Sequence, residues 1–179
     1  MQLFALAPAS LHALRSAVLE CSGADGISRL QEAGFATGEA MFDALAEELA
    51  SDGAPPPDQL PPDAFKLRVG AFLQAHGWGP VTLEPDDQDS DARAIIVTVE
   101  EGPEALAAGS ADDGCPLTTG VLSGLLSRVV DAPVAVMAVE AGVPEAPLRC
   151  RFLAASPATV QLAWQAMSQG RAWREAVRG

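Results

Sequence analysis

The sequence predicts an α+β domain: a largely antiparallel four-stranded sheet of two hairpins, packed with about five helices. Long segments carry apolar residues every three or four positions, which indicates amphipathic helices. Four short segments are instead rich in β-branched residues or alternate between apolar and polar ones, which is typical of strands. A brief connection joins each pair of these short segments, so both hairpins are local and the helices pack against the sheet. The chain has 179 residues, which suits one domain, and we assign residues 1–179 to a single unit.

Five helices follow from the apolar spacing and from residues that begin or end a helix. Ser156 followed by Pro157 is typical of a cap and a first-turn proline, and Pro116 fits the first position of another helix. Gly77 fits the residue just beyond a helix end. The expected helices cover residues 10–21, about 27–50, 63–76, 116–129 and 157 to near the C-terminus.

Glycines recur on the apolar faces of two expected helices. Gly34 and Gly38 lie on such a face in the second helix, and Gly120 and Gly124 repeat this spacing in the fourth. Glycine costs about 1 kcal/mol in a helix interior relative to alanine. Two glycines on one packing face therefore indicate that another helix approaches closely, with the fourth helix as the candidate. Simple tolerance of glycine is the alternative.

The expected strands form two hairpins. The acidic run 86–91 lies between the first two strands and indicates a solvated turn. The stretch 101–114 is polar and rich in Gly and Asp, so we expect a loop there. The strands are expected over residues 78–84, 92–100, 133–140 and 149–155.

Charge and composition exclude several classes of protein. The 11 basic residues are outnumbered by 24 acidic ones, giving a formal charge of -13. Clustered Lys and Arg are what hold phosphate backbones, so nucleic-acid binding is not expected, and neither is attraction to anionic lipid. No apolar run is long enough for a membrane span, and the N-terminus lacks the basic region of a signal peptide. The three cysteines Cys21, Cys115 and Cys150 have no disulfide-framework spacing, which indicates free thiols and a cytoplasmic protein.

The sequence contains no motif that defines an enzyme. It has no Gly-x-Gly-x-x-Gly, no P-loop and no Gly-x-Ser-x-Gly segment. Cys115 precedes a helix N-terminus, where a thiol can become nucleophilic. Only His12 and His76 could serve it as a histidine base, and nothing in the sequence places either one nearby. We expect a non-catalytic protein, with an unreactive Cys115 as the favoured interpretation.

Several segments resemble a known family in order and spacing. One is Cys115-Pro-Leu-Thr-Thr-Gly120-Val-Leu-Ser-Gly124, which is similar to a helix start in 4-vinyl-reductase domains. Another is Glu140 followed by Arg149-Cys150-Arg151-Phe152, which resembles the closing hairpin of that family. The upstream matches are Gly34, Gly38 and the turn Gly77-Trp78-Gly79. The resemblance implies a fold shared with subunits of the TRAPP vesicle-tethering complex and with haem-based nitric-oxide sensors, and a family made mostly of binding modules.

The same resemblance implies a candidate zinc site. Phenol-sensing relatives bind zinc through three cysteines and one glutamate, and Cys115, Glu140 and Cys150 match three of these ligands. The third cysteine would fall near Val143. The candidates for a fourth ligand are Glu145, His76 and water. The alternative, which we favour, is that both cysteines are small buried apolar residues. The chain has no tyrosine, so it lacks the motif of the haem sensors and haem binding is not expected.

We expect the chain to bind a hydrophobic small molecule without catalysing a reaction. Such pockets are apolar and hold a few fixed polar groups. The leading expectation is a tetrapyrrole precursor, with the chain as a carrier or accessory protein in bacteriochlorophyll synthesis for photosynthesis. The alternatives are a TRAPP-like scaffold or dimerisation module, and an aromatic-effector sensor that acts through a partner. We also expect a homodimer or another protein partner. The candidate lining residues, each also explained by core packing, are Phe35, Phe42, Phe72, Trp78, Met137, Phe152 and Trp164, with Met41, Phe65 and Met167 as further candidates.

Overall fold

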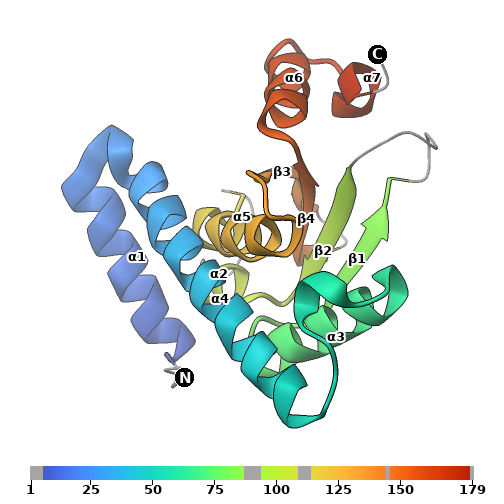
Figure 1. Cartoon of the computed structure of the whole chain (residues 1–179). Coiled ribbons are helices and arrows are strands. Elements are labelled where there is room, and N and C mark those ends of the chain that lie inside the picture. The colour runs from blue at the N-terminus through green and yellow to red at the C-terminus, as the bar shows by residue number, and fades with distance from the viewer. Residues whose placement is uncertain (1–5, 87–93, 109–113, 144–145, 178–179) are drawn as a thin grey trace.

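A four-stranded sheet forms the centre of the molecule (Figure 1). The computed structural model describes residues 6–86, 94–108, 114–143 and 146–177. Every neighbouring pair of strands is antiparallel and the order is β1-β2-β4-β3, so two hairpins lie side by side and β1 and β3 form the edges. This arrangement confirms the expected α+β class. The strands are β1 (Val81–Pro85), β2 (Ile95–Glu100), β3 (Ala135–Val143) and β4 (Ala146–Ala155).

Helices cover both faces of this sheet. Side chains of α2, α3 and α5 pack against one face, which we call the inner face, while α6 and α7 pack against the outer face. The helices are α1 (Pro8–Ser22), α2 (Gly26–Ser51), α3 (Pro62–Ala75), α4 (Pro103–Ala108), α5 (Pro116–Val130), α6 (Pro157–Ser168) and α7 (Trp173–Val177). Two short 3₁₀ turns cover Gly23–Asp25 and Pro57–Gln59. None of the helices in the described ranges has the length and apolar character that a membrane crossing requires.

The central strand β4 has buried residues on both faces. Successive side chains of a strand point to opposite faces. Cys150, Phe152 and Ala154 therefore join the inner core, while Leu153 and Ala155 join the outer one. The inner core is the larger of the two because three long helices pack on it.

The close helix contact expected from the glycines is present between α2 and α5. Each of four glycines has a backbone carbonyl of the other helix where its side chain would begin. The pairs are Gly34 with Leu117, Gly38 with Val121, Gly120 with Gln31 and Gly124 with Phe35. The two backbones are therefore in direct contact, and only glycine leaves room for this approach.

The structure differs from the sequence prediction at several helix ends. Helix α4 lies within the stretch predicted as a loop. The prediction missed it because six residues are too few to show a helical period. The last long helix ends at Ser168, Gly170 follows with φ +72, and a separate helix α7 comes next. Helix α3 begins at Pro62, one residue before the expected start at Asp63, which therefore lies within the first turn instead of capping the helix. The cap at Ser156 is confirmed: its hydroxyl accepts a hydrogen bond from the Thr159 amide at 3.2 Å.

Candidate functional site

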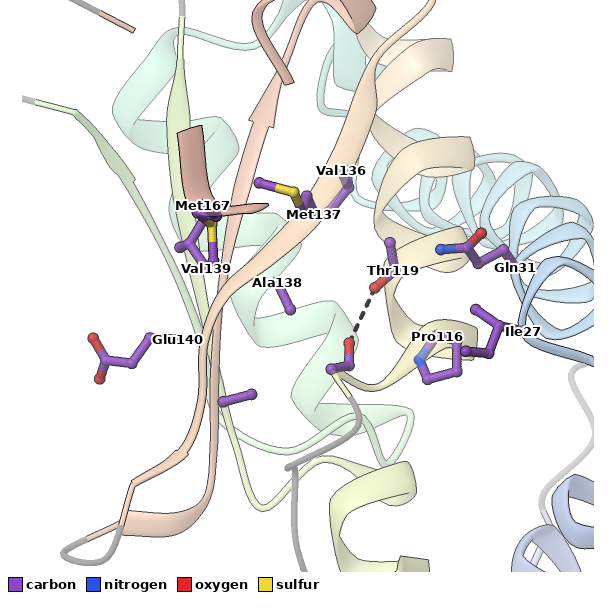
Figure 2. A pocket seen from close by; sticks show the side chains of 12 residues that line it. Ile27, Gln31, Pro116, Thr119, Val136, Met137, Ala138, Val139, Glu140 and Met167 are labelled. Atoms are coloured by element: carbon purple, nitrogen blue, oxygen red, sulfur yellow. Dashed lines mark hydrogen bonds between the residues drawn. The ribbon is translucent and has the colours of Figure 1, made fainter. Parts of the chain in front are cut away.

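A groove of about 370 Å³ runs along the free edge of β3, and we call it the edge groove. Six consecutive residues of this strand, Val136 to Ala141, line it. Because neighbouring side chains point to opposite faces, a hollow lined by all six must lie beside the strand rather than over one face. Figure 2 shows the other walls, with Ile27 and Gln31 of α2, Pro116 and Thr119 of α5 and Met167 of α6 around the strand.

A second hollow of about 340 Å³ lies next to the edge groove, between α2, α5 and the start of β3, and we call it the helix hollow. Gln31, Thr119 and Val136 line both spaces, so the two adjoin. Phe35 forms part of the wall of the helix hollow and is 37% exposed. The remaining lining residues are Ser28, Glu32, Gly120, Ser123 and Ala135.

Two hydroxyl groups of the helix hollow, those of Thr119 and Ser123, already use their protons. Thr119 Oγ1 shares its single proton between the carbonyl oxygens of Cys115 at 3.1 Å and Gly114 at 3.3 Å. The contact with Gly114 is the dashed line in Figure 2. Ser123 Oγ donates to the carbonyl oxygen of Val134 at 2.6 Å. A hydroxyl has one proton and two lone pairs, so both oxygens can still accept a hydrogen bond. The hollow thus favours a ligand that brings its own O–H or N–H group.

Two buried thiols lie close to the edge groove. Cys115 stands between two residues that line the groove, and Cys150 pairs in register with Ala141, which lines it as well. The thiols of Cys115 and Cys150 are hydrogen-bonded to each other, and this contact, together with burial, raises the pKa of Cys115 far above its ordinary value. Cys115 is therefore a protonated thiol at neutral pH, which favours the interpretation of an unreactive residue.

Alkylation should separate the three cysteines by their burial. With iodoacetamide at neutral pH, we expect the exposed Cys21 to react in the folded chain, and Cys115 and Cys150 to react only after denaturation. Peptide mass spectrometry of the alkylated chain measures each site. Modification of Cys115 at the rate of Cys21 would contradict the buried, protonated thiol.

Glu140 does not lie with the two cysteines, because a β-bulge turns it to the other face. Ala138 pairs with Phe152, but Glu140 already pairs with Arg151, so β3 has one extra residue at Val139. In a regular strand, Val139 would pair with Arg151, and Glu140 would pair with Cys150 on the inner face. Figure 2 shows Glu140 directed away from Thr119 and α5. Its carboxylate forms ion pairs with Arg151 at 3.2 Å and Arg149 at 2.9 Å on the outer face.

The ligand set expected for zinc is therefore not brought together. Across the described ranges, no three His, Cys, Asp or Glu residues form a group that could hold a metal ion. Of the candidates for a fourth ligand, His76 hydrogen-bonds through Nδ1 with the carbonyl oxygen of Phe72 at 2.8 Å, and Glu145 lies outside the described residues. The thiols of Cys115 and Cys150 supply two of the four ligands that structural zinc takes.

Two of the seven predicted lining residues line these two hollows. Phe35 is in the helix hollow and Met137 is in the edge groove, together with the further candidate Met167. Phe72 and Phe152 are core residues, since they are packed in the inner core with almost no exposure.

The other three predicted lining residues lie elsewhere. Trp78 is partly buried against the inner core. Phe42 is buried next to Arg128, whose guanidinium carbon lies 4.6 Å from the ring centroid. Trp164 is 60% exposed on α6. The predicted residues are thus spread over the core and the surface, and they do not enclose one interior cavity together.

Sequence reasoning missed Gln31, Thr119 and Ile27 as wall residues. A signal for them existed, because the glycine spacing predicted the contact of the two helices. Gln31 lies one turn before Gly34, and Gln31 and Thr119 flank the point where α2 and α5 touch. Polar residues at the border of a close helix contact are candidates for a hollow where the helices diverge.

A buried carboxylate next to the site was also missed. Glu104 of α4 is 1% exposed and accepts hydrogen bonds from the amides of Leu117 at 3.1 Å and Thr118 at 2.7 Å. Arg15 of α1 lies 3.7 Å from the same carboxylate. A negative charge is favourable at a helix N-terminus, so Glu104 holds the first turn of α5, which carries the wall residues Pro116 and Thr119, in place.

The sheet order and the helices on both faces of the sheet define the fold. It is a TRAPP-like fold, which is also found in a sensory domain from a transcription activator. No family model matches the chain, and no curated protein does.

Two of the solved structures that are similar to this chain show the range of the fold. The first is the phenol-responsive sensory domain of the transcription activator PoxR with phenol, at TM-score 0.66 and 17% identity, covering 87% of this chain and 77% of that one. The second is a trafficking protein particle complex subunit 3 from Naegleria fowleri covalently bound to palmitic acid, at TM-score 0.56 and 10% identity, covering 83% of this chain and 93% of that one. These likenesses confirm the expected TRAPP-like fold. Membership of the 4-vinyl-reductase family stays a prediction, as do the homodimer and the cytoplasmic location.

Proposed function

We propose that this chain is a non-catalytic binding module that takes a small, mostly apolar molecule in the helix hollow. The observation that carries the proposal is a partly exposed aromatic ring, Phe35, in the wall of a hollow that also presents hydrogen-bond acceptors. Ligand sites are typically concave and apolar, with a small number of placed polar groups. The apolar residues beside the ring are Ala135 and Val136. The polar side chains of the wall are Ser28, Gln31, Glu32, Thr119 and Ser123.

The hydrogen bonds that the wall hydroxyl groups already make favour a ligand that carries a hydrogen-bond donor. Thr119 and Ser123 donate their protons to backbone carbonyls and keep lone pairs for a ligand donor. The amide of Gln31 can both donate and accept. An aromatic ring with one hydroxyl group meets these conditions, because the ring can stack on Phe35 while the hydroxyl reaches an acceptor. The similar sensory domain was solved with phenol, which belongs to this class.

Phe35→Ala is expected to weaken the binding of phenol by about tenfold, since the ring contact is lost. The backbone of Phe35 meets Gly124, but its side chain lies outside the helix contact, so the fold should be kept. Isothermal titration calorimetry with phenol and with 1-naphthol measures the affinity. A ligand that binds only the native state also raises Tm.

Leu162→Ala is the matched control, because Leu162 is an apolar residue of α6 that is 51% exposed and lines neither hollow. It should leave phenol binding unchanged. Equal losses in both variants, or no saturable binding by the wild-type chain, would refute the helix hollow as the site.

A more specific proposal is that the chain carries a tetrapyrrole in bacteriochlorophyll synthesis. The size of the helix hollow favours this ligand less than a single aromatic ring. The helix hollow has about 340 Å³, which is near the lower end of the range for pockets that enclose a drug-sized ligand. A four-ring macrocycle would have to extend into the edge groove as well. Absorbance titration with protochlorophyllide tests this finer proposal: a saturable shift would favour the larger ligand, and the absence of one would refute it.

A further inference from the structure

Strand β3 is a nine-residue edge strand, and its first half lacks the features that protect an edge from pairing. Protected edges are short, carry Lys, Pro or inward-facing charge, or are bulged, and in β3 the bulge comes only after Ala138. The opposite edge β1 is such a case, with five residues that end in Glu84 and Pro85. Strand β3 contains no Lys and no Pro, and its single charged residue, Glu140, is matched by arginines of β4. Its regular part before the bulge, Ala135 to Ala138, offers a row of backbone groups on its outer side.

The edge groove limits what can reach this row. One wall is formed by α2 and α5 through Ile27 and Pro116, and the other by α6 through Met167. The strand therefore lies between helices, as Figure 2 shows. A single extended chain needs about 4.8 Å beside its neighbour, the ordinary spacing between strands. The edge of a second copy would bring its own flanking helices into the same space.

The negative net charge of the chain favours a basic partner segment over a second copy of the chain. The chain carries 24 acidic and 11 basic residues, a formal charge of -13, so two copies repel each other while a basic segment is attracted. Exposed apolar groups in the groove, Ile27 and Met167 above all, favour apolar side chains at alternate positions of the incoming strand.

We propose that β3 and the edge groove bind an extended, basic segment of a partner protein, which adds a fifth strand to the sheet and places apolar side chains in the groove. Main-chain hydrogen bonds to an exposed edge are an established mode of peptide recognition. This inference does not depend on a small molecule in the helix hollow, and it gives the module a way to connect with a second protein.

The test uses the peptide acetyl-(Lys-Val)₄-amide and the ¹⁵N-labelled chain. We expect saturable shifts of the amides from Ala135 to Ala141, with slower hydrogen exchange at the alternate residues whose N–H groups face the free edge. The acidic peptide acetyl-(Glu-Val)₄-amide should bind at least about tenfold more weakly, and rising salt should weaken the basic peptide. Shifts that avoid β3, or equal affinity for both peptides, would overturn the proposal.

Peptide methylation tests the backbone pairing without changing the protein. In a strand, alternate residues direct their N–H groups to the same edge. One peptide is N-methylated at its valines and another at its lysines. We expect one of them to lose at least about tenfold in affinity and the other to bind like the parent. Equal binding by both methylated peptides would rule out strand addition.

A pair of variants and a measurement of assembly complete the test. Met137→Lys places a like charge on the edge and should abolish binding of the basic peptide, while Leu162→Lys on α6 should retain most of it. Sedimentation of the chain alone should show a monomer at the concentration of the titration. A dimer in which the β3 amides are already protected would show that a second copy occupies the edge, and would overturn the proposed partner.

Discussion

Gly120→Ala is expected to destabilise the chain by about 3 kcal/mol or more, or to prevent folding. The new methyl group would overlap the carbonyl oxygen of Gln31, and the backbone amide of Phe35 lies close by. Neither helix can give way easily, because three further glycines keep the same contact along α2 and α5. The gain in helix propensity from alanine, about 1 kcal/mol, is too small to offset this clash. Urea unfolding followed by circular dichroism measures the change.

Ala36→Gly is the control for this variant. Ala36 is exposed on α2, so its replacement should cost only the propensity difference of about 1 kcal/mol. One variant replaces glycine with alanine and the other replaces alanine with glycine. Both should lower the free energy of unfolding of the chain, with the larger effect at position 120. A Gly120→Ala protein with wild-type stability would show that the helices do not touch through their backbones.

Glu104→Ala is expected to destabilise the chain by about 3 to 5 kcal/mol, because it removes one partner of a buried charged network. The amides of Leu117 and Thr118 lose their acceptor, and Arg15 loses a nearby negative charge. Glu104→Gln keeps one oxygen acceptor and should cost less. Thermal and urea unfolding of both variants give the two values.

A surface ion pair of the same chain provides the control for Glu104→Ala. Asp43 and Arg128 are 2.9 Å apart, but both side chains are substantially exposed. Asp43→Ala should therefore cost no more than about 1 kcal/mol. A similar small effect for Glu104→Ala would mean that α4 does not hold the first turn of α5.

The elements that could be predicted from sequence are those whose signal is local. The period of the apolar residues and the turn residues indicated both hairpins and the long helices. The contact of α2 with α5 was also a candidate from sequence, because glycines such as Gly34 and Gly120 recur on the apolar faces of both helices. Short helix α4 has no such signal, since six residues do not complete two turns.

The candidate site was harder to predict because it depends on register and on distant partners. The alternation of β3 placed Glu140 on the face of Cys150, and one bulged residue at Val139 moved it to the other face. Glu104 binds amides 13 and 14 residues further along the chain, which no local pattern reveals. Phe72 and Phe152 were predicted as lining residues because sequence cannot distinguish a core aromatic residue from one beside a cavity.

The unequal size of the two cores has a consequence for how the native state fluctuates. The outer core holds few large side chains, chiefly Ile96, Leu153 and Trp173, while the inner core is closed by three long helices. Sub-global opening should therefore begin with α6 and α7, which can detach while the sheet stays intact. Because α6 carries Met167, this detachment widens the edge groove on one side and leaves the helix hollow unchanged. Entry of a long segment beside β3 and entry of a small molecule between α2 and α5 would then have different rates in one folded chain.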